Sequence, residues 1–216
     1  MKGTEGVWAS QSGGVIAKLG GAAGGAAYLG IAFLVVTLID ALAAAGQVGA
    51  TRDEEAEGYL DNLLARPASR LPWLAGRFAV SVAALTAAGL AAGLFTWAGA
   101  AATSASLSFA TMLAAGVNVV PAGILVLGIG TLMHGLAPRY AAIVAYGIVA
   151  WSFLVEIVGA GVGASHWLLD LSILHHITRA PAIALRWDMA AILIAIAIAA
   201  AIAGAVAFSR RDLQGA

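Results

Sequence analysis

The chain has 216 residues, of which 62% are hydrophobic and 10% are charged, and its mean hydropathy is +0.95. Soluble domains are about 45–50% apolar and about 25% charged, so this composition excludes a water-soluble globule and predicts a membrane bundle. The net charge is zero and no cysteine occurs, which excludes nucleic acid as an implied partner, disulfides and Cys-based metal sites.

Five apolar stretches approach or exceed the roughly 20 residues that a helix needs to cross a bilayer. They lie at about 26–48, 78–100, 109–133, 140–163 and 189–208. None of them alternates apolar with polar residues as the strands of a membrane barrel do. The sequence therefore predicts an all-α polytopic membrane protein in which residues 1–216 form one transmembrane domain.

Lys and Arg set the predicted orientation, because cytoplasmic loops carry an excess of positive charge. With five spans, segments 49–77 and 134–139 share one side with the C-terminal tail, and this side carries seven Lys and Arg. The other side holds the N-terminus, 101–108 and 164–188, with four. We therefore expect 49–77 and the C-terminus to be cytoplasmic, 164–188 to be an extracytoplasmic amphipathic segment, and the protein to lie in a bacterial plasma membrane.

A charged segment, 51–72, separates the first two spans and contains five of the chain's eleven acids. Thr51 and Glu54 have the spacing of a capping box, which predicts that a helix starts here. Pro67 predicts its end, because proline has no N–H and disfavours helix at the preceding residue. Three leucines at helical spacing form its apolar face, namely Leu60, Leu63 and Leu64.

The acid excess of this predicted helix indicates what it contacts. Helices that lie on the inner leaflet are usually basic, because the leaflet is anionic. The segment is net acidic before Arg66. This favours docking to a protein partner, and a solvated loop helix is the alternative.

Residues 54–70, EEAEGYLDNLLARPASR, resemble the segment after the second span of ABC-2 type exporter permeases, in particular the actinobacterial exporters of polyketide antibiotics. Residues 167–182 resemble the extracytoplasmic segment before the last span, and 208–213 resemble the close of such permeases. Asn62 and Ile173 depart from the family pattern. The matching positions in the first segment are Glu54, Glu55, Gly58, Leu60, Asp61, Leu63, Leu64, Arg66, Pro67, Ser69 and Arg70.

The resemblance implies that 53–66 is a coupling helix that sits in a groove of a separate ABC ATPase. We assign the matching positions and Glu57 to this coupling surface. ATP and Mg²⁺ would bind the ATPase, and this chain would hold no cofactor. The sequence contains no G-x-x-x-x-G-K-[ST], G-x-S-x-G or H-E-x-x-H motif, so no catalytic residue is assigned. The resemblance also implies a second permease unit as partner, and that this chain corresponds to helices two to six of a six-helix unit without its first.

Two acids fall inside predicted spans, where an unpaired carboxylate is costly. Asp40 in the first span is a candidate for the translocation path or for a contact between helices. Alternatively it lies near the inner interface, since Arg52 follows about three turns later. Glu156 in the fourth span is a candidate for the path or for pairing with an Arg, or it lies near the outer headgroups.

Pro121 interrupts the third span and predicts a kink, because the residue four positions earlier loses a backbone partner. Asn118, one turn earlier, is predicted to bond the freed carbonyl or a neighbouring helix. Two glycine pairs have the small-xxx-small spacing that lets helices approach closely, Gly89/Gly93 and Gly159/Gly163.

Histidines crowd the predicted outer segment. A metal or haem site there is disfavoured because adjacent histidines do not share a helix face and the usual ligand spacing is missing. The alternative is an interfacial segment in which Trp167, Leu171 and Leu174 enter the headgroups. The residues in question are His166, Asp170, His175 and His176.

These features together predict the permease subunit of an ATP-driven exporter of a hydrophobic or amphiphilic compound, such as a macrolide- or polyketide-like drug. Its expected partners are an ABC ATPase, a second permease unit, membrane lipids and the small-molecule substrate. The alternatives are a lipid or glycan exporter subunit, a non-transporting scaffold or regulatory subunit, and a channel or secondary carrier that uses Glu156.

Overall fold

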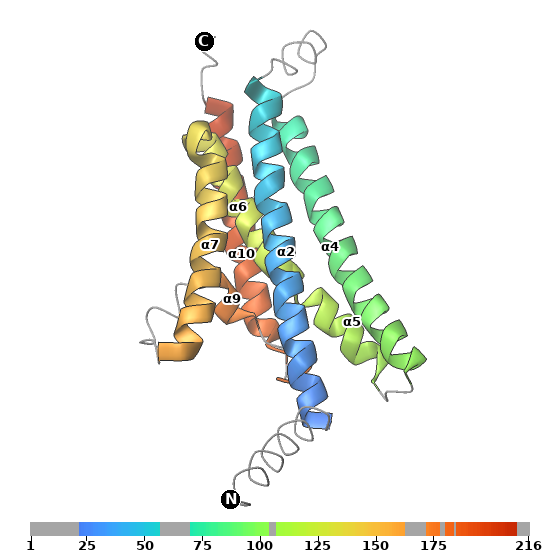
Figure 1. Cartoon of the computed structure of the whole chain (residues 1–216). Helices are drawn as coiled ribbons and strands as arrows, with labels where there is room; N and C mark the ends of the chain where they lie inside the picture. Colours follow the sequence, from blue (N-terminus) through green and yellow to red (C-terminus); the bar gives the residue numbers. More distant parts are fainter. Residues whose placement is uncertain are drawn as a thin grey trace, which may run out of the picture.

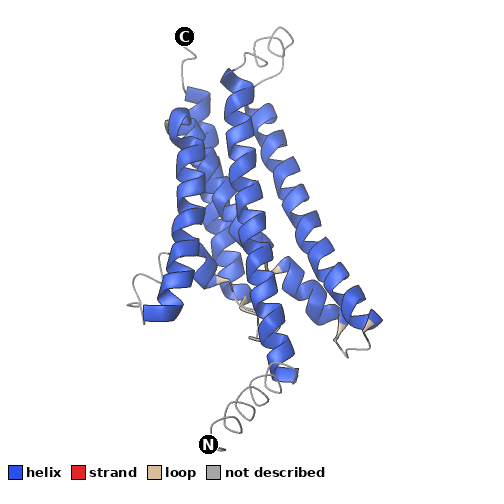
Figure 2. Cartoon of the chain, in the orientation of Figure 1, coloured by secondary structure: helices blue, strands red, loops and turns tan. Residues whose placement is uncertain are grey.

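A computed structural model describes residues 22–56, 70–103, 107–162, 172–177, 180–183 and 185–210. Within these ranges the chain forms helices and no strand, which confirms the predicted all-α class (Figures 1 and 2). The helices are α2 (Ala22–Ala56), α4 (Arg70–Ala102), α5 (Phe109–Val117), α6 (Val120–Leu136), α7 (Pro138–Val162), α9 (Ile173–His176) and α10 (Trp187–Arg210).

The described residues contain five segments that are long and apolar enough to cross a membrane, as the sequence predicts. In Figure 1, α2, α6 and α10 end at the top, where α4 and α7 begin. We call this the upper end, and the opposite end of the bundle the lower end. The segments between α2 and α4 and between α6 and α7 therefore leave from the same end of the bundle, in agreement with the predicted five-span topology.

Helix α6 is the centre of the bundle. The span that contains it is 78% buried, whereas the other four spans are 22–39% buried. Helix α6 packs against α2, α4, α7 and α10. It is apolar on nearly all sides, as expected of a helix surrounded by others, whereas the outer helices expose rows of large apolar side chains.

The expected helix start at Thr51 is wrong. Helix α2 runs without interruption from Ala22 to Ala56, and the Thr51 hydroxyl donates to the Gln47 carbonyl oxygen at 2.8 Å, one turn earlier in the same helix. The hydroxyl therefore bonds backward instead of capping a new helix. The sequence changes from apolar to acidic near Thr51, but this change in composition does not end the helix.

Helix α4 also extends beyond its predicted span, since it begins at Arg70 instead of near Phe78. Residues 70–72 are therefore helical, although they belong to the charged segment predicted to lie between the first two spans. Pro72 lies in the first turn of α4, where its missing N–H breaks no intrahelical hydrogen bond.

The interruption predicted from Pro121 is confirmed, and it falls at Asn118 and Val119, whose backbone angles stay in the right-handed helical region. Helix α5 ends at Val117 and α6 begins at Val120. Pro121 lies in the first turn of α6. Helix α5 packs against α4 instead of continuing along α6 (Figure 1).

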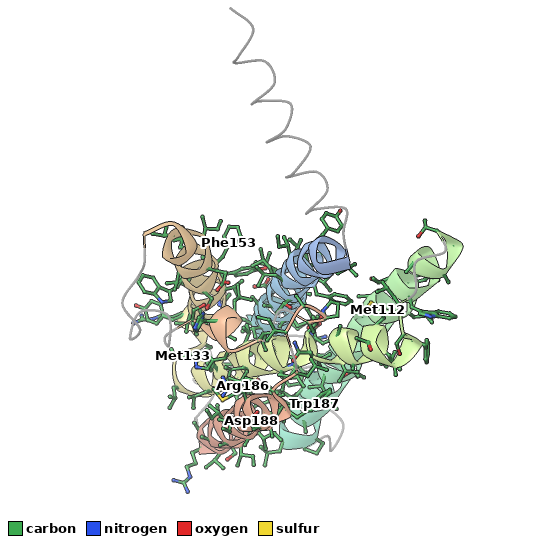
Figure 3. All side chains as sticks on the ribbon, turned by 90° about the horizontal axis from the view of Figure 1, so that it is seen from below. Met112, Met133, Phe153, Arg186, Trp187 and Asp188 are labelled. Atoms are coloured by element: carbon green, nitrogen blue, oxygen red, sulfur yellow. The ribbon has the colours of Figure 1, made fainter. Side chains whose placement is uncertain are left out.

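Close helix packing at Gly89 and Gly93 is confirmed. A Cβ at Gly89 would come within 2.6 Å of the Gly116 carbonyl oxygen of α5, and one at Gly93 within 2.6 Å of the Met112 carbonyl oxygen. Met112, labelled in Figure 3, is fully buried at this crossing. The second predicted pair, Gly159/Gly163, stays a prediction because Gly163 lies outside the described residues.

The segment before the last span folds back against the bundle. Helix α9 packs against α7 and α2. Ser172 donates from its hydroxyl to the Ser152 carbonyl oxygen at 3.2 Å, and the Ile173 N–H donates to the Ser152 hydroxyl at 3.1 Å. Leu174 is only 3% exposed, so its predicted insertion into headgroups is wrong: the protein covers it. His166, Trp167, Asp170 and Leu171 lie outside the described residues.

Candidate functional site

Two consecutive glutamates at the end of α2 bind two different helices. Glu54 Oε1 lies 2.8 Å from Arg77 Nη1 of α4, and Glu55 Oε2 lies 3.1 Å from His134 Nε2 of α6. Consecutive residues point about 100° apart on a helix, so the two carboxylates face different neighbours. The upper ends of α2, α4 and α6 are therefore joined by ionic or hydrogen-bonded contacts.

The two contacts differ in burial. The side chains of His134 and Glu55 are 2% and 13% exposed, whereas those of Arg77 and Glu54 are 28% and 40% exposed. The His134 ring also lies against the Phe208 ring of α10, with 5.5 Å between the centroids. Since exposed ion pairs contribute little and a buried acid depends on its partner, the Glu55–His134 contact is the more important one for stability.

The structure describes three of the residues assigned to the coupling surface. Glu54 and Glu55 contact the bundle itself, and Arg70 is the first residue of α4. The remaining nine lie outside the described residues, so the coupling surface stays a prediction. They are Glu57, Gly58, Leu60, Asp61, Leu63, Leu64, Arg66, Pro67 and Ser69.

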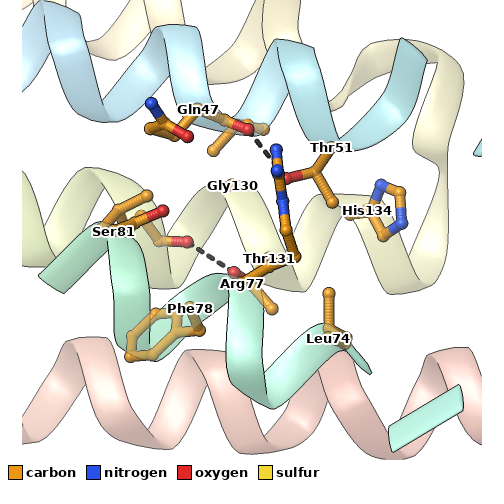
Figure 4. Close-up of a pocket in the computed structure, with 11 residues that line it drawn as sticks. Gln47, Thr51, Leu74, Arg77, Phe78, Ser81, Gly130, Thr131 and His134 are labelled. Carbon is orange, nitrogen blue, oxygen red and sulfur yellow. Dashed lines mark hydrogen bonds between the residues drawn. The ribbon is translucent and has the colours of Figure 1, made fainter. Parts of the chain in front are cut away.

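A shallow cleft lies directly beneath these contacts, between α2, α4 and α6 (Figure 4). The Thr51 and Thr131 hydroxyls donate to carbonyls of their own helices, at 2.8 Å each. Arg77 reaches from α4 toward α2. The lining residues are Gln47, Val48, Thr51, Leu74, Arg77, Phe78, Ser81, Leu127, Gly130, Thr131 and His134.

Asp40 lies deeper, near the middle of α2. It is 4% exposed, and its Oδ2 atom is buried without a hydrogen-bond partner. Sixteen residues separate Asp40 from Ala56, or about 24 Å of helix, and eighteen separate it from Ala22, or about 27 Å. This position favours the intramembrane alternative over a place at the interface.

The other predicted intramembrane candidates are also buried. Glu156 is 8% exposed and lies one turn after Ser152, the residue that contacts the segment around α9. Asn118 is 4% exposed at the break between α5 and α6, and Pro121 follows it in the first turn of α6. The structure does not bring these residues into the α2–α4–α6 cleft, and their transport roles stay predictions.

Arg77, Ser81 and His134 are site residues that sequence reasoning missed. In the sequence Arg77 stands out only as a charge that sets topology, and His134 belongs to no recognisable motif. The sequence does contain a feature that predicts these contacts. In the five-span topology, the first span ends, the second begins and the third ends on the same side of the membrane. Acids at the first of these positions and bases at the other two therefore predict contacts across helices.

The comparisons with known proteins agree with this architecture. Residues 4–209 match the model of the family described as "Multidrug efflux system permease Rv1217c, C-terminal domain". The chain is also similar to the multidrug efflux system permease protein Rv1217c of Mycobacterium tuberculosis (strain ATCC 25618 / H37Rv), with 28% identity over 197 residues. This alignment covers 87% of the chain but only 34% of the relative, so the chain spans about a third of that protein's length.

Proposed function

The chain belongs to the family of the C-terminal domain of the multidrug efflux system permease Rv1217c, and from this membership we propose that it is a permease unit of an ATP-driven exporter. Its cargo is a hydrophobic or amphiphilic compound of the drug or antibiotic class. The observation that carries the proposal is the family match over residues 4–209, which agrees with the ABC-2 type resemblance of 54–70.

The chain itself is not catalytic in this proposal. A separate ABC ATPase binds ATP and Mg²⁺, and a second permease unit completes the path. Segment 49–77 and the C-terminus lie in the cytoplasm of a bacterial cell. The excess of Lys and Arg at this end supports that orientation.

The contacts at the upper end support a route for coupling. The predicted coupling segment, 51–72, begins in the last part of α2, which holds Glu54 and Glu55, and ends in the first turn of α4, shortly before Arg77. Because Glu54 binds Arg77, a push on the segment moves α2 and α4 together. Because Glu55 binds His134, the same motion also reaches α6.

Helix α6 passes this motion on to α10. The two helices pack closely against each other, and Gly135 of α6 lies directly against Gly204 of α10. ATP-driven closure of the ATPase therefore acts on four connected helices, which tilt as bodies and change which side of the membrane the path faces.

Inverted membrane vesicles that contain the complete exporter and its ATPase test the proposal. We expect an amphiphilic dye to accumulate only with ATP and Mg²⁺. In the Glu54→Arg variant two positive charges face each other, and we expect accumulation to fall about fivefold or more, within the usual range of coupling energies. The exchange variant Glu54→Arg/Arg77→Glu restores the pair and is expected to recover most of the transport.

Two outcomes would contradict the proposal. Dye movement that is unaffected by ATP depletion but abolished by Glu156→Gln would indicate a secondary carrier. Equal transport by wild type and the single variant would show that the Glu54–Arg77 contact takes no part in coupling, even if ATP-driven export is confirmed.

A further inference from the structure

Asp40 is a buried acid that has no role in the proposed coupling route. Its Oδ2 atom makes no hydrogen bond with the described residues, and Asp40 makes no ion pair there. An ionised carboxylate near the middle of a membrane costs several kcal/mol unless it is paired or wetted, about 3 kcal/mol or more at a helix centre. An apolar residue would pack here without that cost, so the acid calls for a functional explanation.

The carboxylate points at bare backbone. A Cβ added to Gly123 of α6 would lie 2.7 Å from Asp40 Oδ2 and 3.1 Å from Leu85 Cδ1 of α4. Glycine therefore leaves the space that the carboxylate occupies. Gly123 comes two residues after Pro121, in the first turn of α6.

The cleft beneath the upper end lies between the same three helices as this carboxylate. Ser81 and Leu127 line the cleft, and Leu85 and Gly123 lie one helical turn deeper on the same helices. On α2, Gln47 of the cleft lies two turns above Asp40. Asp40 thus lies one to two turns below the cleft, on the seam where α2, α4 and α6 meet.

The basic groups along this seam already have acids as partners. Arg77 pairs with Glu54 and His134 with Glu55, both at the upper end. Arg77 is eight residues from Leu85, which is about 12 Å along α4, and His134 is eleven residues from Gly123, which is about 17 Å along α6. The nearest described cations on these helices are therefore too far away to neutralise Asp40.

We propose that Asp40 is the counter-ion for the cationic group of an exported amphiphile, which enters through the α2–α4–α6 cleft and meets the carboxylate beyond it. The inference rests on the proposed export function and narrows its cargo to positively charged amphiphiles. Gln47 and Ser81 supply polar contacts on the way, and the apolar walls at Val48, Phe78 and Leu127 accept the rest of the molecule.

Binding of tetraphenylphosphonium, a permanent lipophilic cation, to the solubilised exporter tests the site. Loss of a charged partner is worth about tenfold or more in affinity, so we expect Asp40→Asn to weaken binding by at least that factor. Asp188→Asn is the matched control, because Asp188 is a surface acid with a side chain 66% exposed. Unchanged binding by Asp40→Asn, or an equal loss in both variants, would overturn the inference.

A second variant keeps the test decisive if Asp40→Asn does not fold. Gly123→Ala adds a methyl group at the Oδ2 position and leaves the acid in the chain. We expect it to weaken binding of the cation as well, and normal binding by a folded Gly123→Ala protein would count against the site.

Transport by the complete exporter separates this inference from the proposed function. In inverted vesicles supplied with ATP, we expect Asp40→Asn to lose transport of ethidium, a permanent cation, and to keep transport of the neutral dye Nile red. If wild type exports neither dye, the proposed function fails. If wild type exports both and Asp40→Asn loses both or neither, the export function stands and the counter-ion role is refuted.

Discussion

Glu54 and Glu55 have the same chemistry and adjacent positions, and they differ in how far water reaches them. The Glu54 side chain is 40% exposed and the Glu55 side chain is 13% exposed. The exposure of their partners differs in the same direction. Arg77, the partner of Glu54, is partly exposed, whereas His134, the partner of Glu55, is buried beside Phe208. The two residues therefore form a natural matched pair for measuring what burial adds to a polar contact.

Neutralising each glutamate is expected to have unequal effects on stability. Glu55→Gln weakens a buried contact and leaves His134 with a poorer partner, so we expect a loss of about 1–3 kcal/mol in the free energy of unfolding. Glu54→Gln removes a partly exposed pair and is expected to cost about 1 kcal/mol or less. Equilibrium unfolding in detergent micelles measures both.

A double-mutant cycle with His134→Asn identifies the partner. If Glu55 acts through His134, the double variant is expected to lose less than the two single variants combined. Additive losses, or a larger loss in Glu54→Gln than in Glu55→Gln, would contradict the burial argument.

At the scale of the helices, sequence and structure agree on which segments span the membrane and differ on where the helices begin and end. Hydropathy located the five spanning segments found among the described residues, because burial in lipid requires a long apolar run. It did not locate the end of α2 or the start of α4, because a helix continues into water until a residue stops it. Pro121 correctly predicted an interruption of the third span, since the effect of proline is local and does not depend on neighbouring helices.

The crossing of α6 and α10 depends on glycines that the sequence did not single out. A Cβ at Gly204 would meet the Thr131 carbonyl oxygen and would lie 2.6 Å from the Thr131 carbonyl carbon and 2.7 Å from Leu132 Cα. These are backbone atoms, which cannot move aside as a flexible side chain can. With 27 glycines in the chain, spacing alone does not distinguish such positions from glycines with open space around them.

We expect Gly204→Ala to force α6 and α10 apart and to destabilise the bundle by about 1–3 kcal/mol, the usual cost of overpacking. Gly147→Ala in α7 is the matched control, because a Cβ there meets nothing within 4 Å. That control is expected to be neutral, or more stable by up to about 1 kcal/mol through helix propensity. Thermal unfolding of the two variants beside wild type gives the comparison, and equal effects would refute the close contact at Gly204.

At the scale of the whole molecule, hydropathy and charge predicted which helix ends meet. They did not predict which side chains pair there, because pairing depends on the rotation of each helix about its axis. The Glu54–Arg77 and Glu55–His134 contacts and the position of Asp40 against Gly123 all depend on that rotation. The place of Leu174 was wrongly predicted because an apolar side chain fits a lipid surface and a protein surface equally well.

The orientation of the bundle governs both proposals, and the absence of cysteine makes it measurable. Ser209 is exposed near the upper end of α10, and Thr103 is exposed just after the lower end of α4. Since the end predicted to be cytoplasmic carries seven Lys and Arg against four, we expect a membrane-impermeant maleimide added to intact cells to label Thr103→Cys and not Ser209→Cys. Permeabilised cells are expected to show labelling of both, which controls for reactivity. The reverse pattern would place the α2–α4–α6 cleft outside the cell, where neither an ATPase nor cytoplasmic cargo could reach it.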